Sequence, residues 1–247
     1  MAHRGRAILV RQGDTTEDGV LPDDSEIVIG PDGLGRPKWA VRSPSMQDFY
    51  DRVWGEPVSD DDGVFRMLSL LILQAGLFWG SILGRAEEMD LLLFHFSPHR
   101  IATLSEEDAE SVLEAPGMLR NPRKLKAIIG NARAYLEMTT PPTHSPDGPM
   151  TGLAELVWSF QPETTPVPHA QSEVPLESAE SVALAKALKA RGFTFVGPRI
   201  CYSLMQCIGV VDTNLVGTHR RGVTGLWSKD GARLYTSGPE ETPEKGG

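Results

Sequence analysis

The chain has 247 residues, 40% of them hydrophobic, and a formal net charge of −9. This length fits one domain with appendages, and no apolar run reaches the roughly 18 residues of a membrane helix. Two cysteines, Cys201 and Cys207, are too few for a disulfide framework or a metal site of their own. We therefore expect a cytoplasmic protein without a membrane anchor.

Residues 1–35 are rich in Gly, Asp and Pro and hold two short β-like pieces, AILV and EIVIG. They predict a non-helical N-terminal extension that includes a hairpin. Helical patterns follow, and Gly, Pro and Glu after residue 220 predict a frayed tail over 221–247. The helices are expected in residues 43–54, 59–83, 86–95, 105–114, 122–138, 152–160, 178–192 and 198–209. The sequence therefore predicts an all-α domain over residues 36–220.

Two basic segments interrupt this acidic chain, residues 120–133 and 186–199, and neither contains an acid. The overall balance argues weakly against a nucleic-acid partner, whereas the clustering permits one. Charge alone favours two solvated helix faces.

The junction ARGFTFVGPRICYSLMQ is the most informative turn. One predicted helix ends at Gly192, Gly197 permits a tight turn, and Pro198 begins the next helix. Phe193, Phe195 and Val196 are expected to pack inward. Free N–H groups at a helix start attract anions, so this hairpin can bind a DNA phosphate, although an ordinary corner between helices is the alternative.

Five stretches between about Arg36 and Thr218 carry a resemblance to a known family. They are DFYDRVWGEPVSDD, LLILQAGLFWGSIL, GMLRNPRKLKAIIGNARAYL, LVWSF and KALKARGFTFVGPRICYSLMQCIGVV. The chain resembles the DNA-3-methyladenine glycosylase I family of helix-hairpin-helix DNA glycosylases. The resemblance implies that fold, and it implies hydrolysis of the N-glycosidic bond of alkylated adenine flipped out of double-stranded DNA.

The resemblance also implies a base pocket in which aromatic faces stack on a cationic base. Phe49, Trp54 and Trp79 are the candidates, and core packing is the alternative role of these three rings. Phe49 stands where the family usually has Tyr.

Gln74 and Gly76 match the family's pocket wall, where a small Gly lets the base approach. The family's base-binding Glu falls on Leu71, and a family Ser falls on Phe78. Loss of a polar partner weakens discrimination, so we expect Leu71 and Phe78 to favour a bulkier or less polar lesion.

The expected DNA contacts come from the basic segments and the hairpin. They are Arg120, Arg123, Lys124, Lys126, Val196, Gly197 and Arg199.

Family members bind zinc through Cys, His, His and Cys. Those positions fall on Pro37, Tyr50, Asn214 and Thr218, none of which keeps a zinc-binding side chain. We therefore expect no zinc and no other cofactor, and we hypothesise that the N-terminal extension replaces the metal link.

Asp212 lies in a Val-Asp-Thr context that resembles the catalytic Asp of other superfamily members. It would stabilise an oxocarbenium-like sugar or activate water. A helix N-cap or a surface acid is the alternative.

These observations predict a monomeric DNA glycosylase of base excision repair with reduced or altered specificity. A catalytically silent DNA- or lesion-binding protein is the first alternative. A repurposed pocket acting on a small nucleoside-like molecule is the second. A glycosylase needs both basic segments on one face with the hairpin, around the mouth of the pocket.

Overall fold

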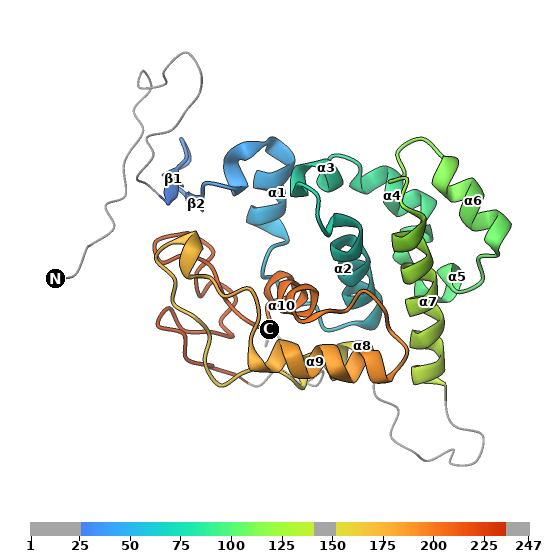
Figure 1. Ribbon diagram of the computed structural model, residues 1–247. Coiled ribbons are helices and arrows are strands. Elements are labelled where there is room, and N and C mark those ends of the chain that lie inside the picture. Colours follow the sequence, from blue (N-terminus) through green and yellow to red (C-terminus); the bar gives the residue numbers. More distant parts are fainter. Residues whose placement is uncertain (1–25, 141–151, 236–247) are drawn as a thin grey trace, which may run out of the picture.

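The computed structural model describes residues 26–140 and 152–235. Helices dominate, as predicted (Figure 1). In chain order they are α1 Pro44–Arg52, α2 Asp61–Gln74, α3 Trp79–Leu83, α4 Ala86–Leu92, α5 Pro98–Ile101, α6 Glu106–Glu114, α7 Pro122–Thr139, α8 Leu153–Trp158, α9 Ala179–Ala190 and α10 Pro198–Cys207. Short 3₁₀ turns occupy Ala40–Arg42, Phe94–Phe96 and Gln171–Glu173.

Helices α1, α6 and α9 begin within one residue of the predicted ranges. Ser43 accepts the Met46 N–H before α1, and Ser105 forms a capping box with Asp108 before α6. Ser178 does the same before α9, where its hydroxyl accepts a backbone N–H three residues on. Local side-chain chemistry therefore fixes these boundaries.

The core surrounds α2 and α10. Nine of the α2 side chains are buried, and α10 packs against both α2 and α9. Figure 1 shows α10 near the centre, with α9 along one side, α1 and α3 above, and α7 beside α2. Cys201 and Cys207 are buried free thiols, and burial raises the pKa of Cys201 to about 12, so both act as small apolar groups.

The predicted N-terminal hairpin is present, but it forms within residues 26–37. Strand β1 (Ile27–Ile29) pairs antiparallel with β2 (Gly35–Pro37), and Gly33 provides the turn with φ +78°. EIVIG therefore supplies one strand, while the AILV piece lies outside the described residues. The second strand extends past the predicted domain boundary at residue 36.

The expected helix over 59–83 is wrong, because two helices meet there at a turn. Helix α2 ends at Gln74, Ala75 leaves the helical region with ψ 117°, and Gly76 takes φ +78°. Helix α3 then begins at Trp79.

The prediction of a frayed tail from residue 221 is also wrong as far as residue 235. The Trp227 side chain is 1% exposed, and its Nε1 donates to Gly209 O at 3.1 Å. The Thr165 N–H donates to Gly231 O, so this segment packs beside the loop that follows α8. None of the described helices is both long and apolar enough to cross a bilayer.

Candidate functional site

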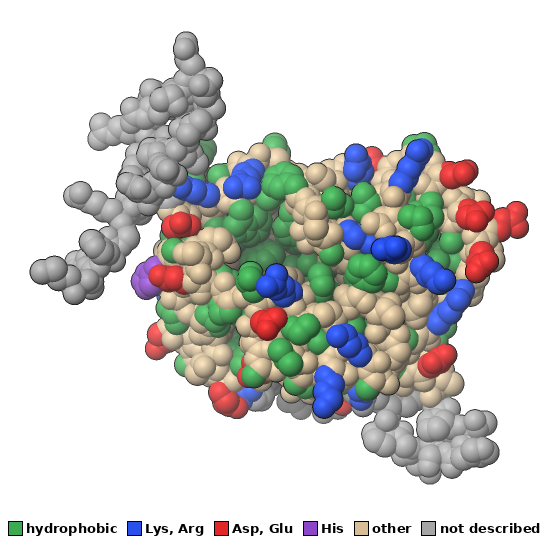
Figure 2. Space-filling view, in the orientation of Figure 1, with side chains coloured by type: hydrophobic (Ala, Val, Ile, Leu, Met, Phe, Trp, Pro, Cys, Tyr) green, Lys and Arg blue, Asp and Glu red, His purple; other side chains and the backbone are tan. Residues whose placement is uncertain are grey.

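A cavity of about 510 Å³ opens between α1, the turn after α2, and α10. Figure 2 shows it as a hollow among hydrophobic side chains, between the positions of α1 and α10 in Figure 1. Its lining comprises Pro37, Trp39, Tyr50, Trp54, Gln74, Ala75, Gly76, Gln171, Val174, Pro175, Leu176, Arg199, Ile200, Tyr202, Ser203, Gln206, Thr213, Asn214 and Leu215. Segments far apart in the chain therefore build one site.

Aromatic rings in edge-to-face contact form one wall of the cavity. The Trp39 and Trp54 ring centroids lie 5.2 Å apart, and those of Trp39 and Tyr50 lie 5.3 Å apart. Such T-shaped pairs are favourable because the positive edge of one ring meets the negative face of the other. Two indoles held this way offer a preformed surface for a flat ligand.

Trp39 was missed by the sequence analysis, which singled out Trp54. The sequence offered only a Trp within the matching region, two residues after Pro37 and outside any helical pattern. The 3₁₀ turn that follows directs it toward Trp54.

Phe49 and Trp79 pack against each other, and Phe49 also packs against this aromatic wall. Their ring centroids are 5.1 Å apart, and Phe49 also meets Trp54 at 6.2 Å. Phe49 is 6% exposed, and neither residue lines the cavity. Their position supports the alternative role, in which these rings pack and hold the wall.

The turn after α2 brings Gln74 and Gly76 to the cavity, as predicted from the family pattern. The Gln74 side-chain Nε2 donates to Leu77 O at 2.7 Å, so the amide stabilises the turn itself. Gly76 allows the positive φ that reverses the chain, where a side chain would be strained. The Gln74 side-chain bond and the positive φ of Gly76 explain why these two residues interrupt the apolar run LLILQAGLFW.

Lys124, expected among the DNA contacts, belongs to the same turn. Its side chain is buried, and Nζ donates to Leu73 O and Ala75 O at 2.7 Å each. Those carbonyls lie at the end of α2 and lack helical partners, and burial lowers the pKa of this amine. The structure therefore makes Lys124 a helix-capping group rather than a surface cation.

Leu71 and Phe78 also depart from the expected pocket, because neither lines the cavity. Leu71 faces inward on α2 and is 3% exposed, so its apolar side chain joins the core. Phe78 points outward from the turn and is 49% exposed. Their expected effect on lesion preference stays a prediction.

Asp212 is neither a surface acid nor a helix N-cap, and its catalytic role stays a prediction. It follows α10, is 8% exposed, and does not line the cavity. Its carboxylate accepts the Gly222 N–H at 2.8 Å and the Asn214 N–H at 2.9 Å, and Arg221 lies 3.5 Å away. The carboxylate thus organises the C-terminal segment and presents Thr213 and Asn214 to the cavity.

The hairpin between α9 and α10 is anchored to α7 by Asn131. The Asn131 side-chain amide accepts the Thr194 N–H at 2.7 Å and donates to Thr194 O at 3.1 Å. Asn131 is 1% exposed and was missed by the sequence analysis, where it stood unremarked inside a helical run. The hairpin is therefore held in a fixed position relative to α7.

The hairpin tip differs from the expected inward packing at one residue. Phe193 and Val196 are buried, but Phe195 takes φ +57° and is 44% exposed. Since the Val196 side chain is enclosed, only its backbone remains for a DNA contact. Gly197 precedes α10 without a side-chain cap, so the first N–H groups of α10 are free of capping side chains.

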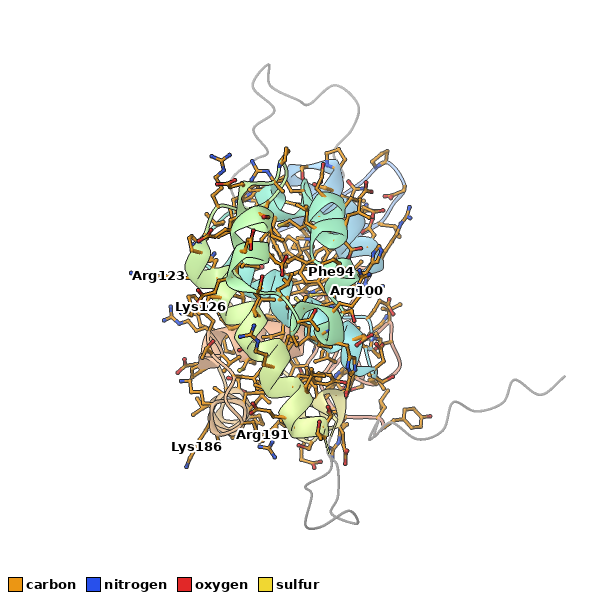
Figure 3. All side chains as sticks on the ribbon, turned by 90° about the vertical axis from the view of Figure 1, so that its right-hand side faces the viewer. Phe94, Arg100, Arg123, Lys126, Lys186 and Arg191 are labelled. Carbon is orange, nitrogen blue, oxygen red and sulfur yellow. The ribbon has the colours of Figure 1, made fainter. Side chains whose placement is uncertain are left out.

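The basic residues gather on one face. Figure 3 shows Arg123 and Lys126 from α7 and Lys186 from α9 pointing to the same side, which is the face seen in Figure 2. These three, together with Arg120 and Arg199, are exposed, and Arg199 also lines the cavity. Arg133 differs, because it donates to Ala102 O and Leu104 O and thus joins α7 to the chain after α5.

Comparison with known proteins identifies this arrangement. The model of a methyladenine glycosylase family matches residues 39–221. The chain belongs to that family.

The chain is 40% identical over 182 residues to "DNA-3-methyladenine glycosylase 1" of Escherichia coli K12, covering 72% of this chain and 92% of that protein. It is 35% identical to "DNA-3-methyladenine glycosylase" of Haemophilus influenzae, with the same coverage. A crystal structure of "3-methyladenine DNA glycosylase I (TAG)" matches with a TM-score of 0.67 at 37% identity, over 74% of this chain and 97% of that one. The helical fold is therefore that of the family.

The four positions where the resemblance places family zinc ligands do not suit the metal. Pro37 offers no donor, and the other three provide a phenol, an amide and a hydroxyl. Burial raises the pKa of Tyr50, which keeps its phenol neutral. In residues 26–140 and 152–235, no group of three His, Cys, Asp or Glu is placed to hold a metal.

An ionic cluster lies at this place between the N-terminal hairpin and the C-terminal segment. Arg36 is buried and pairs with both Asp32 and Asp51 at 2.7 Å. His219 Nε2 lies 3.3 Å from the Asp51 carboxylate, and its Nδ1 lies 2.9 Å from Gly35 O. These side-chain contacts connect strand β2, helix α1 and residue 219.

Proposed function

We propose that this protein is a DNA N-glycosylase of base excision repair, which turns an alkylated adenine out of double-stranded DNA and hydrolyses its N-glycosidic bond. The observation that supports it most directly is the position of the aromatic cavity beside the hairpin, on the same face as the exposed cations of α7 and α9. The names of its relatives specify 3-methyladenine DNA glycosylases.

DNA binding comes first in this proposal. Arg123, Lys126 and Lys186 neutralise phosphates along the duplex, which gives affinity without sequence preference. The free N–H groups at the start of α10 take a phosphate near the lesion, and Arg199 adds a charge at the mouth of the cavity.

The extruded base then stacks within the cavity. A flipped base exposes two π-faces, and the Trp39 and Trp54 indoles offer aromatic surface at the cavity wall. A purine alkylated at N3 is cationic, so it also gains cation–π attraction from these rings. Gln74 and Gln206 place neutral amides along the same lining.

The charge of the alkylated base simplifies the chemistry. When the C1′–N9 bond breaks, its electrons pass to the cationic ring, and the base leaves neutral without protonation. Water adds to C1′ and releases a proton to solvent. None of the described residues lining the cavity is Asp, Glu or His, so positioning and stacking, rather than a general acid, supply the rate enhancement in this proposal.

Release of 3-methyladenine from methylated duplex DNA at low salt tests the activity. Trp39→Ala and Trp54→Ala should each lower the rate at least about fivefold, because base–aromatic stacking contributes roughly 1–3 kcal/mol per base. Leu91→Ala alters an exposed apolar side chain outside the cavity lining and should leave the rate unchanged. Failure of the wild-type chain to release any base would refute the proposal.

We further propose that the protein acts as a zinc-free monomer. Supporting this are the unsuitable side chains at the four family positions and the ionic cluster of Arg36, Asp51 and His219. Purified protein should contain far less than one zinc per chain, and a chelator should not lower its melting temperature. A stoichiometric metal or a chelator-sensitive transition would contradict this. Sedimentation analysis of the purified protein tests whether it is a monomer.

A catalytically silent lesion-binding protein is the second candidate. The absence of acidic and imidazole groups among the described cavity-lining residues favours it, since such a site binds more readily than it catalyses. Tight binding of alkylated duplex with no base release would identify this function. A small-molecule enzyme is less consistent with the structure, because it has no use for the exposed cations on the face that contains the cavity.

A further inference from the structure

An apolar ledge, defined here as Val174, Pro175 and Leu176, forms part of the cavity lining. It lies in the connection between α8 and α9, far in sequence from the aromatic wall. Pro175 and Leu176 are exposed, and Leu176 is 65% exposed. Three consecutive apolar residues with two of them exposed to water at a binding cavity indicate a surface that an apolar ligand group covers.

Hydrogen bonds hold this ledge at both ends. Before it, Glu173 accepts the His169 N–H at 2.7 Å, and the Gln171 N–H lies 3.3 Å from a Glu26 carboxylate oxygen. After it, Ser178 caps α9. A ledge fixed in this way is preorganised, so a ligand does not have to order it on binding.

The cavity is larger than a free methylated base requires. Its 510 Å³ equals the volume of roughly 17 water molecules at about 30 Å³ each. Adenine with one methyl group has fewer heavy atoms than that number. Clefts of about 300–1,000 Å³ usually hold ligands the size of a drug molecule.

Two amide donors of the lining are already engaged within the protein. Gln74 Nε2 is bonded to Leu77 O, and Gln206 Nε2 is bonded to Thr213 Oγ1 at 2.9 Å. Arg199 is the one charged residue among the described lining residues, and its charge repels a cationic base. Apolar contact and stacking therefore contribute to the binding selectivity, beside the polar atoms of Tyr50 and Asn214 in the same lining.

We propose that the cavity selects adenines bearing an alkyl or aryl group larger than methyl, with that group lying on the ledge while the ring stacks at Trp39 and Trp54. This rests on the proposed function for its biological substrate, although the ligand preference of the cavity stands separately. Each additional buried methylene improves binding roughly fourfold. A benzyl group that is only partly buried should therefore gain at least tenfold over methyl.

Titration of the full chain with free 3-methyladenine and with free 3-benzyladenine, followed by tryptophan fluorescence, tests the preference without any turnover. Binding of the benzyl base at least tenfold tighter than the methyl base supports the proposal. Equal binding, or tighter binding of the methyl base, overturns it.

Base release from duplex DNA treated with a methylating or a benzylating agent provides the second measurement. The ratio of benzyl to methyl release should exceed one and should fall about tenfold in Leu176→Asn. Leu91→Asn is the matched control, since Leu91 is 67% exposed outside the cavity lining, and it should leave the ratio unchanged. An equal ratio in wild type and Leu176→Asn overturns the role of the ledge.

The two measurements separate the two proposals. If neither DNA releases a base, glycosylase activity fails, and the free-base titration alone then decides the ligand preference. If only methylated DNA releases a base, the activity stands and the ledge proposal is wrong.

Discussion

Two residues that resemble functional groups in the sequence support other residues in the structure. Lys124 lies in a basic run with Arg123 and Lys126. Of these three side chains, only that of Lys124 is buried. Asp212 lies in a catalytic-looking triplet, yet backbone N–H groups occupy its carboxylate. At the residue scale, function therefore depends on the direction of each side chain.

Replacement of Lys124 by Ala should destabilise the protein rather than weaken DNA binding specifically. The variant leaves Leu73 O and Ala75 O without a donor, and an unpaired buried polar group costs about 1–3 kcal/mol. At roughly 2–4 °C per kcal/mol for a chain of this size, the melting temperature should fall by about 2–12 °C. Scanning calorimetry provides the measurement.

Lys126→Ala is the matched control for that experiment, because Lys126 is exposed on the same helix. It should keep the wild-type melting temperature and bind duplex DNA more weakly. If Lys124→Ala melts like the wild type and binds DNA as weakly as Lys126→Ala, then the capping role assigned to Lys124 is incorrect.

At the scale of elements, the sequence predicted helix starts better than chain reversals. The predicted helix ranges began at Ser43, Ser105 and Ser178, which are N-caps in the structure, because a cap depends on residues only three positions away. The break at Gly76 was not, because it depends partly on Lys124, which approaches from α7. The site shows the same limit, since Trp54 and Gln74 were predicted to line the pocket but the ledge at Leu176 was not.

The link between α7 and the hairpin gives a prediction at this scale. Asn131→Ala removes both side-chain bonds to the Thr194 backbone, so the hairpin should open more readily. Hydrogen exchange over residues 193–197 should accelerate by at least about fivefold, as expected for the loss of 1 kcal/mol or more. Affinity for duplex DNA should fall as well, because the start of α10 is no longer held against the phosphate.

Thr194→Val is the control that separates the Thr194 hydroxyl contact from the two backbone bonds. It removes the Thr194 hydroxyl, which lies 3.4 Å from Asn131 Oδ1, but keeps both backbone bonds. Exchange in this variant should match the wild type. Unchanged exchange in Asn131→Ala would show that the hairpin is rigid without its anchor.

For the whole molecule, the net charge was a poor guide to DNA binding, and the distribution of charge over the surface was a better one. The chain carries −9 overall, yet Arg123, Lys126 and Lys186 share the face that contains the cavity. Acidic residues elsewhere, including the exposed first turn of α6, determine the sum. A phosphate backbone responds mainly to the nearest charges, since charges beyond a Debye length of about 8 Å are screened at physiological salt.

The salt dependence of DNA binding follows from this distribution. Each neutralised phosphate adds about 0.9 to the slope of log affinity against log salt concentration. The double variant Arg123→Gln with Lys126→Gln should therefore lower that slope by about 1.8. Lys229→Gln, an exposed cation outside α7, α9 and the hairpin, should leave it unchanged. Fluorescence anisotropy on an undamaged duplex across a salt series measures both slopes. Equal losses in the two variants would mean that the net charge, and not this face, governs the encounter with DNA.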